Sequence, residues 1–342
     1  ATEVAVGDSG TFPSSGQVKL LFTRPGSPKI ELDENMLGGG SISGLLRFNN
    51  TDLAEGRNLL GRMALAIGRS INYQQGMGLT LDGEKGKPLF SEPKSALGYT
   101  SGIAEGIIDF QTPLGTSQFA ASDYEVRFTS PPGGQIIRLS DGTTTNVSDF
   151  TDPAGVMMDG LTFKFTAAGT LNERVLFKPF ADAAANIQAL VYSPRDLAAA
   201  NPINAAMSPS NGGTLQLAGL QATGDHWDPA TSKVVGTGVV NPPPPGRVTL
   251  TYTDGPPAGF TINGTLDRPL NIPPPAPYTP GTTIVPYTPG QPIRIDGWSI
   301  NLKGSPKAGD TVTIGNAKDA QYGDYYTRNA GNATALMNLR DV

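Results

Sequence analysis

The sequence predicts a mainly β protein of the α+β class, in which one long helix accompanies two antiparallel β-rich domains. Composition is the first observation behind this prediction. The chain of 342 residues contains 43 Gly and 30 Pro, and 16% of it is charged, which favours strands and turns over a helical bundle. The other two observations are periodicities. Residues 50–75 carry apolar side chains at helical spacing, whereas many later segments alternate apolar and polar side chains.

The first predicted element is a β-hairpin near the start of the chain. Residues 18–23 and 29–32 both alternate, and the sequence Arg24-Pro25-Gly26-Ser27-Pro28 lies between them. Proline and glycine supply the backbone angles that tight turns need. We therefore expect two antiparallel strands that lie beside the helix.

The long helix is predicted over residues 50–75. Asn50, Thr51 or Asp52 can cap its start, and Gly76 is a plausible stop because glycine accepts the left-handed turn that ends many helices. A single apolar stripe of this kind needs a packing partner. The stripe consists of Leu53, Leu60, Met63, Ile67 and Ile71.

Three arginines, Arg57, Arg62 and Arg69, lie on the polar side of this helix with few acids to pair them. One interpretation is an ordinary solvated face. The other is a contact with another subunit, and both remain open at this point.

Strands are expected through the middle of the chain. In the first half, residues 105–110, 124–129, 135–139, 161–165 and 175–178 alternate, and the Ala-rich residues 181–200 include room for a short helix. Residues 248–253, 295–304 and 310–314 resemble three of these segments in order, which suggests a diverged repeat. The proline-rich residues 242–245 and 273–292 should be extended surface loops.

No constellation in the sequence supports catalysis, a cofactor or a metal. There is no Cys, and His226 is the single His without an accompanying nucleophile motif. Asp-Gly pairs at residues 141, 159, 254 and 296 are typical of hairpin turns rather than of calcium loops. The net charge of -5 argues against nucleic acid, and no apolar run of membrane-spanning length or signal-peptide pattern is present.

Two stretches carry a family resemblance. The first is the run Gly39-Gly40-Ser41-Ile42-Ser43-Gly44-Leu45-Leu46-Arg47-Phe48 with the later Arg57-Asn58, Leu60-Gly61, Met63-Ala64, Asn72 and Gln74. It resembles the central segment of the FlgK family of flagellar hook-associated proteins, where a glycine-rich turn feeds a long rod helix. The second, residues 329–339, is similar to the start of that family's returning rod helix. Residues 119–191 also look like its outer β-domain.

The resemblance implies a domain plan. Residues 1–90 would be a rod part, residues 91–201 and 202–320 two outer β-domains, and residues 321–342 the returning helix. The rod would thus be built from both chain ends, with Leu336 and Leu339 packing on the stripe. The chain would be a central fragment that lacks both terminal assembly segments, and we expect it to be monomeric in dilute solution.

The resemblance also implies a function and partners. The chain would be a non-enzymatic, extracellular part of the flagellum at the hook–filament junction, exported by the flagellar type III apparatus without a cleaved signal. Its partners would be copies of itself, the hook protein, the filament-side junction protein and an export chaperone that binds the missing C-terminal segment. The alternative is an adhesin-like array of β-domains that binds a glycan or host surface, with Trp227 and His226 in its loops.

Overall fold

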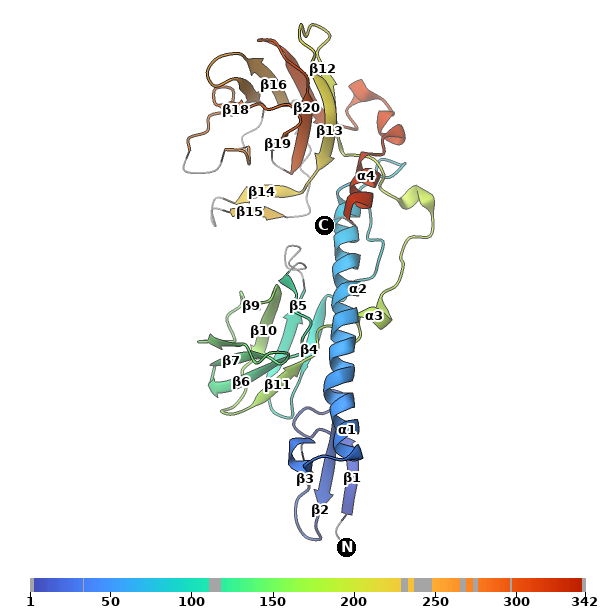
Figure 1. Ribbon diagram of the computed structural model, residues 1–342, viewed down its shortest axis with the longest axis vertical. Helices are drawn as coiled ribbons and strands as arrows, with labels where there is room; N and C mark the ends of the chain where they lie inside the picture. The colour runs from blue at the N-terminus through green and yellow to red at the C-terminus, as the bar shows by residue number, and fades with distance from the viewer. Residues whose placement is uncertain are drawn as a thin grey trace. The chain divides into compact units, whose positions relative to one another are not determined.

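The computed structural model describes residues 3–32, 34–110, 118–228, 233–236, 248–264, 269–272, 276–295 and 297–339 (Figure 1). The predicted proline-rich loop at residues 242–245 and Asp296 lie outside this part of the chain. The chain divides into two compact units: Ala1–Arg69 with Ser91–Gln188, and Ser70–Phe90 with Ala189–Val342. One boundary between the units, between Arg69 and Ser70, falls within a long helix.

The first unit begins with a three-stranded antiparallel sheet made of β1 (Glu3–Asp8), β2 (Val18–Thr23) and β3 (Ile30–Leu32). β2 and β3 form the predicted hairpin, in which Phe22 lies opposite Ile30. β1 is an additional strand that the sequence reasoning missed. It pairs with β2 along its whole length although most of its residues are exposed, so backbone pairing rather than burial defines it.

The long helix begins earlier than predicted. Residues 38–40 are three glycines with positive φ and make the turn that precedes Ser41; a short 3₁₀ turn, η1 (Glu34–Leu37), comes before them. From there α1 (Ser41–Arg47), the π-helical turn η2 (Phe48–Asp52) and α2 (Leu53–Gly76) follow one another directly. The predicted cap residues therefore lie inside the helix. The side chain of Asn50 hydrogen-bonds to the backbone of β2 instead of capping the helix. The helix ends at Gly76 as predicted, but Gly76 does not adopt the positive φ of the expected left-handed turn.

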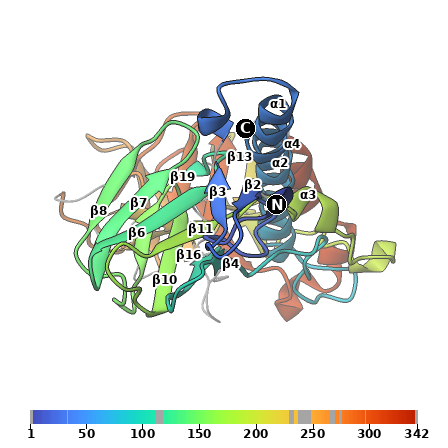
Figure 2. The same cartoon turned by 90° about the horizontal axis from the view of Figure 1, so that it is seen from below.

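An eight-stranded antiparallel sheet forms the larger part of the first unit, in the order β8-β7-β6-β11-β4-β5-β10-β9. Figure 2 shows β8, β7 and β6 as neighbours. All five segments predicted as strands in this region are strands. The bounds are β4 (Ser95–Tyr99), β5 (Glu105–Asp109), β6 (Tyr124–Ser130), β7 (Gly133–Arg138), β8 (Thr144–Val147), β9 (Val156–Met158), β10 (Leu161–Ala167) and β11 (Arg174–Phe177).

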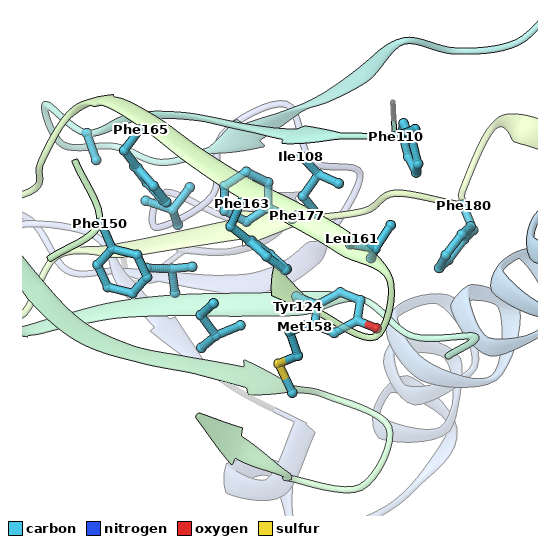
Figure 3. Packing of buried hydrophobic residues seen from close by; sticks show 14 of the residues in the cluster. Ile108, Phe110, Tyr124, Phe150, Met158, Leu161, Phe163, Phe165, Phe177 and Phe180 are labelled. Atoms are coloured by element: carbon cyan, nitrogen blue, oxygen red, sulfur yellow. The ribbon is translucent and has the colours of Figure 1, made fainter. Parts of the chain in front are cut away.

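Aromatic side chains fill the core of this sheet (Figure 3). Phe163 and Phe165 point to the same side of β10 because alternate residues of a strand share a face. Phe163 meets Phe177 of β11 edge to face, with ring centroids 5.5 Å apart, an arrangement that aromatic pairs favour. Phe180 follows β11, and its carbonyl lies directly against α2. The short helix α3 (Ala183–Asn186) comes next, within the Ala-rich stretch.

The second unit contains a five-stranded sheet, β12-β21-β16-β17-β18, a three-stranded sheet, β13-β20-β19, and a two-stranded β14-β15 ladder. The three segments expected from the repeat are strands here. The bounds are β12 (Ile203–Met207), β13 (Gln216–Ala222), β14 (Asp225–Asp228), β15 (Lys233–Gly236), β16 (Val248–Thr253), β17 (Gly259–Asn263), β18 (Ile284–Pro286), β19 (Pro292–Ile295), β20 (Trp298–Lys303) and β21 (Thr311–Asn316).

The two β-regions share one strand order. Reading β18-β17-β16-β21-β12 and then β13-β20-β19 reproduces the order of the eight-stranded sheet, with a break between β12 and β13. The registers agree as well. Val126 pairs with Val175 in the first unit, and Leu250 pairs with Val312 in the second. In both units the carbonyl before the last strand, of Glu173 or Asp310, accepts a backbone hydrogen bond from an aromatic residue of the opposing strand.

The described chain closes with short helical turns, η5 (Ala320–Tyr322) and η6 (Tyr325–Arg328), and with α4 (Gly331–Asn338); a similar turn, η4 (Pro194–Asp196), precedes β12. α4 is shorter than the helix expected over residues 321–342, because Gly323 with positive φ and the extended Asn329 interrupt the path. It packs against β13.

Candidate assembly surface

One face of the long helix leaves large apolar side chains in solvent. Leu59, Leu60, Met63 and Ile67, which we call the exposed stripe, are 59%, 59%, 53% and 51% exposed. They recur at spacings of three and four residues, so they lie along one side of α2. Ile42, Leu45 and Phe48, from α1 and the π-helical turn, are also more than half exposed. A soluble protein that exposes such a run usually has an interaction there.

The opposite face of α2 is buried, and it contains small and amide side chains. Its members also follow a spacing of three and four: Asn58, Gly61, Leu65, Gly68, Asn72 and Gln75. Gly61 explains the preference for small residues, because a Cβ there would lie 1.9 Å from the carbonyl oxygen of Phe180. The backbone of the β-domain thus approaches the helix more closely than a larger side chain would permit.

The amides on this face bind the backbone of loops. Asn72 Oδ1 accepts from the backbone N–H groups of Leu89 and Phe90 at 2.8 and 2.9 Å, and its Nδ2 donates to the carbonyl of Phe90. Gln75 donates to the carbonyl of Asp196 at 2.9 Å and accepts from the N–H of Ala198. Buried amides paired in this way satisfy backbone groups that a loop cannot satisfy itself.

Within the second unit, the returning segment contacts the last turn of α2. Asn332 is fully buried in the second unit, where its side chain accepts from Gln74 Nε2 at 2.6 Å and donates to the carbonyls of Gln74 and Ala198. Leu336 and Leu339 are half-buried near the end of α4. Leu53 and Ile71, the remaining predicted stripe positions, are half-buried on α2.

The three arginines differ in their surroundings. Arg57 and Arg62 are exposed beside the stripe, as the sequence suggested. Arg69 is not on that surface: its side chain is 10% exposed and lies 3.7 Å from Glu92. Burial lowers the pKa of Arg69, while the charges of Glu92 and Asp109 oppose the shift. Arg69 therefore pairs with a residue of its own unit, and its expected part in a subunit contact stays a prediction.

A cluster of charged side chains around Glu125 links segments within the first unit. Glu125 on β6 accepts two hydrogen bonds from Arg174 at 2.7 and 2.6 Å and another from Arg127. Burial alone would raise the pKa of Glu125, but these arginines outweigh it and hold the pKa below its usual range. Arg174 also lies over the ring of Phe12, 5.1 Å from its centroid. The cluster thereby fastens the β1–β2 loop to the large sheet.

The Asp-Gly sequences behave as turns where they are described. Asp159 and Gly160 have φ of 52° and 74° between β9 and β10. The Asp159 carboxylate accepts from Arg138 at 2.8 Å and from the Tyr124 hydroxyl at 2.7 Å. Within the described residues no group of three or more His, Cys, Asp or Glu side chains is placed to hold a metal ion. His226 lies on β14, and its side chain is outside the described part.

Comparison with known proteins adds the family to this geometry. Residues 1–90 match a family model described as the flagellar hook-associated protein FlgK helical domain. The chain is also 30% identical over 214 residues to flagellar hook-associated protein 1 of Escherichia coli (strain K12), an alignment that covers 62% of this chain and 38% of that protein. This chain is thus similar to FlgK, most clearly over the helical domain. The Salmonella typhimurium protein of the same name is 29% identical over 202 residues, covering 59% and 36%.

A solved structure agrees with the FlgK relationship at the level of the fold. The flagellar hook junction protein FlgK from Burkholderia pseudomallei aligns with a TM-score of 0.68 and 21% identity over 99% of this chain and 61% of that one. The sequence matches span less than half the length of the curated FlgK relatives. None of the helices in the described ranges is long and apolar enough to cross a membrane.

The buried face of α2 is the feature that sequence reasoning missed. The FlgK-like motif included Asn58, Gly61, Asn72 and Gln74. The apolar periodicity, however, predicted that the opposite side of the helix is the packing face. A signal was present, because glycines and amides repeat at spacings of three and four. Such residues indicate a helix face that touches backbone rather than side chains.

Proposed function

We propose that this chain is a structural, non-enzymatic part of the bacterial flagellum and belongs to the adaptor layer at the hook–filament junction. The match of residues 1–90 to the FlgK helical domain carries this proposal. In such a layer, copies of the chain contact one another and also contact the hook protein and the filament-side junction protein. Head-to-tail contacts of this kind generate rings or helical layers from one subunit type.

The exposed stripe is the proposed packing surface of the rod. Leu60, Met63 and Ile67, each more than half exposed in this chain, become buried in the assembled protein, with Leu53 and Ile71 at the margins of the contact. Leu336 and Leu339, in the returning segment, are proposed to pack in the same rod. Arg57 and Arg62 provide lateral contacts to neighbouring subunits, because they are charged and exposed beside the apolar surface.

The domain plan remains part of the proposal. Residues 1–90 form the rod part, residues 91–201 and 202–320 the outer β-domains, and residues 321–342 the returning segment of a rod built from both chain ends. The shared strand order of the two β-regions supports their origin from one repeated domain. As a hook-associated protein the chain acts outside the cell, exported by the flagellar type III apparatus with a chaperone on its C-terminal segment.

Substitutions in the exposed stripe test the function. The full-length protein with Leu60→Asp, Met63→Asp and Ile67→Asp together would be produced in a bacterium that lacks its own copy. Because each side chain is more than half exposed, the variant should fold, yet it should fail to attach filaments and to restore swimming. Charges in a surface that must become dry oppose assembly.

Leu171→Asp is the matched control, since Leu171 is 63% exposed in the turn before β11. It should swim like the wild type. Circular dichroism of both purified variants separates a folding defect from an assembly defect. Normal swimming of a folded triple variant would contradict the proposed role of the stripe.

A further inference from the structure

A buried amide and a buried carboxyl join the long helix to the large sheet of the first unit. Asn58 on α2 is 3% exposed, and Asp123, immediately before β6, is 8% exposed. Asn58 Nδ2 donates to Asp123 Oδ1 at 2.9 Å. The two residues are 65 positions apart in the sequence, so this bond is a direct tie between the helix and the β-domain.

One hydrogen bond between Asn58 and Asp123 is missing when Asp123 is ionised. Asn58 Oδ1 is buried and has no hydrogen-bond partner, and an unpaired buried acceptor destabilises the folded state. An ionised carboxylate offers no hydrogen to it, because both oxygens can only accept. A protonated carboxyl has one O–H donor in addition to an acceptor oxygen, which is the complement of a side-chain amide.

We propose that Asn58 and Asp123 form a proton-operated clasp between α2 and β6. In acid, a proton from solvent adds to the carboxylate, and the resulting O–H donates to Asn58 Oδ1 while the other oxygen still accepts from Nδ2. At higher pH the proton returns to solvent, and the donated bond is lost. The hold of the helix on the β-domain is therefore tighter in acid.

The surroundings favour proton uptake by the folded chain. A cavity of about 210 Å³ is lined by both Asn58 and Asp123 and gives solvent a route to them. Burial raises the pKa of Asp123, against the opposing effects of the Asn58 hydrogen bond and the charge of Lys178. The folded chain thus binds this proton at a pH where the unfolded chain has released it.

Other charged groups near the clasp have defined positions. Lys19 of β2 and Glu55 of α2 line the same cavity. Lys178, after β11, donates to the carbonyl of Ser15 at 2.9 Å. Arg138 of β7 is engaged by Asp141 and Asp159, and Glu125 of β6 by Arg174. The described side-chain hydrogen-bond partner of the Asp123 carboxyl is Asn58.

The sign of the pH effect follows from the raised pKa. Between the ordinary aspartate range and the folded value, the native state binds more protons than the unfolded state, so the free energy of unfolding falls as pH rises through this window. Asp123→Asn should remove the dependence, because an amide at position 123 donates to Asn58 Oδ1 at every pH.

Two measurements on the full chain test the clasp. In ¹³C NMR of labelled Asp carboxyls, Asp123 should titrate above the range of an ordinary aspartate, and the side-chain amide signals of Asn58 should shift along the same curve. Asn58 signals that stay constant while Asp123 titrates, or an Asp123 that titrates normally, would overturn the proposal. This measurement uses the wild-type chain and does not depend on any variant folding.

Thermal unfolding across the same pH window is the second measurement. The midpoint of the wild type should fall as pH rises through the Asp123 titration, and that of Asp123→Asn should stay level. Asp182→Asn removes an exposed carboxylate from the same unit and should keep the wild-type slope. A wild-type slope in Asp123→Asn would show that the proton acts elsewhere.

Discussion

The side chain of Asn50 pairs with both backbone groups of Val18, as a neighbouring strand residue would. Asn50 Nδ2 donates to the carbonyl of Val18 at 2.8 Å, and the Val18 N–H donates to Asn50 Oδ1 at 2.9 Å. This explains why Asn50 does not cap the helix: its amide is committed to β2. It also explains how a small sheet with mostly exposed side chains in β1 is held to the helix.

Asn50→Ala should therefore destabilise the chain. The change leaves the part-buried N–H and C=O of Val18 without protein partners, a loss of about 1–3 kcal/mol in the free energy of unfolding. Asn49→Ala is the control, because Asn49 makes longer hydrogen bonds, at 3.4 Å to the Gly16 carbonyl and at 3.2 Å to Asn50 Oδ1. Denaturant titrations of both variants provide the comparison, and equal effects would count against the strand-like role of Asn50.

Two glycines of α2 should respond oppositely to alanine. At Gly61 a Cβ would lie 1.9 Å from the carbonyl oxygen of Phe180, so Gly61→Ala should cost about 1–3 kcal/mol through overpacking. At Gly56 nothing lies within 4 Å, and Gly56→Ala should stabilise the helix by about 0.5–1 kcal/mol. Thermal melts decide the matter. Stabilisation by Gly61→Ala would mean that the helix and sheet are further apart than described.

The two sides of α2 should also differ toward a buried charge. Leu65→Asp places a carboxylate at a position that is 3% exposed and should cost more than about 3 kcal/mol. Leu60→Asp, at a position that is 59% exposed, should stay within about 0.5 kcal/mol of the wild type. Circular dichroism melts measure both. A severe loss in Leu60→Asp would show that the stripe is already covered within this chain.

Glu125 should make the chain sensitive to acid. Its pKa lies below the usual range in the folded state, so the unfolded state takes up the proton first as pH falls. The stabilisation is present above the unfolded pKa and is lost as pH falls through the folded value. This trend is opposite to that of Asp123.

Glu125→Gln should abolish the Glu125 part of the acid dependence and cost about 1–3 kcal/mol near neutral pH, because the partner Arg174 is 41% exposed and keeps part of its hydration. Unfolding free energies at several pH values below neutrality measure the effect. An unchanged acid limb in Glu125→Gln would place the sensitivity at other carboxylates.

Local patterns were sufficient for part of the elements. Alternation located β2, β3, β6 and β10, since a strand with one buried face must alternate. The glycines at residues 38–40 marked a turn because few other residues adopt positive φ, and Gly76 marked the end of α2. The match between residues 248–253 and 124–129 corresponds to strands at equivalent places in the two units. The FlgK resemblance also depended on short local sequence motifs.

Tertiary structure decided which side of α2 is buried. Periodicity shows that Leu60, Met63 and Ile67 share a face, but burial depends on what approaches the helix, and the backbone at Phe180 approaches the side with Gly61. Arg69 and Asp123 show the same limit, because their partners Glu92 and Asn58 are distant in sequence. Sequence determines where side chains lie on their own element, whereas desolvation and hydrogen bonding are set by segments that only folding brings together.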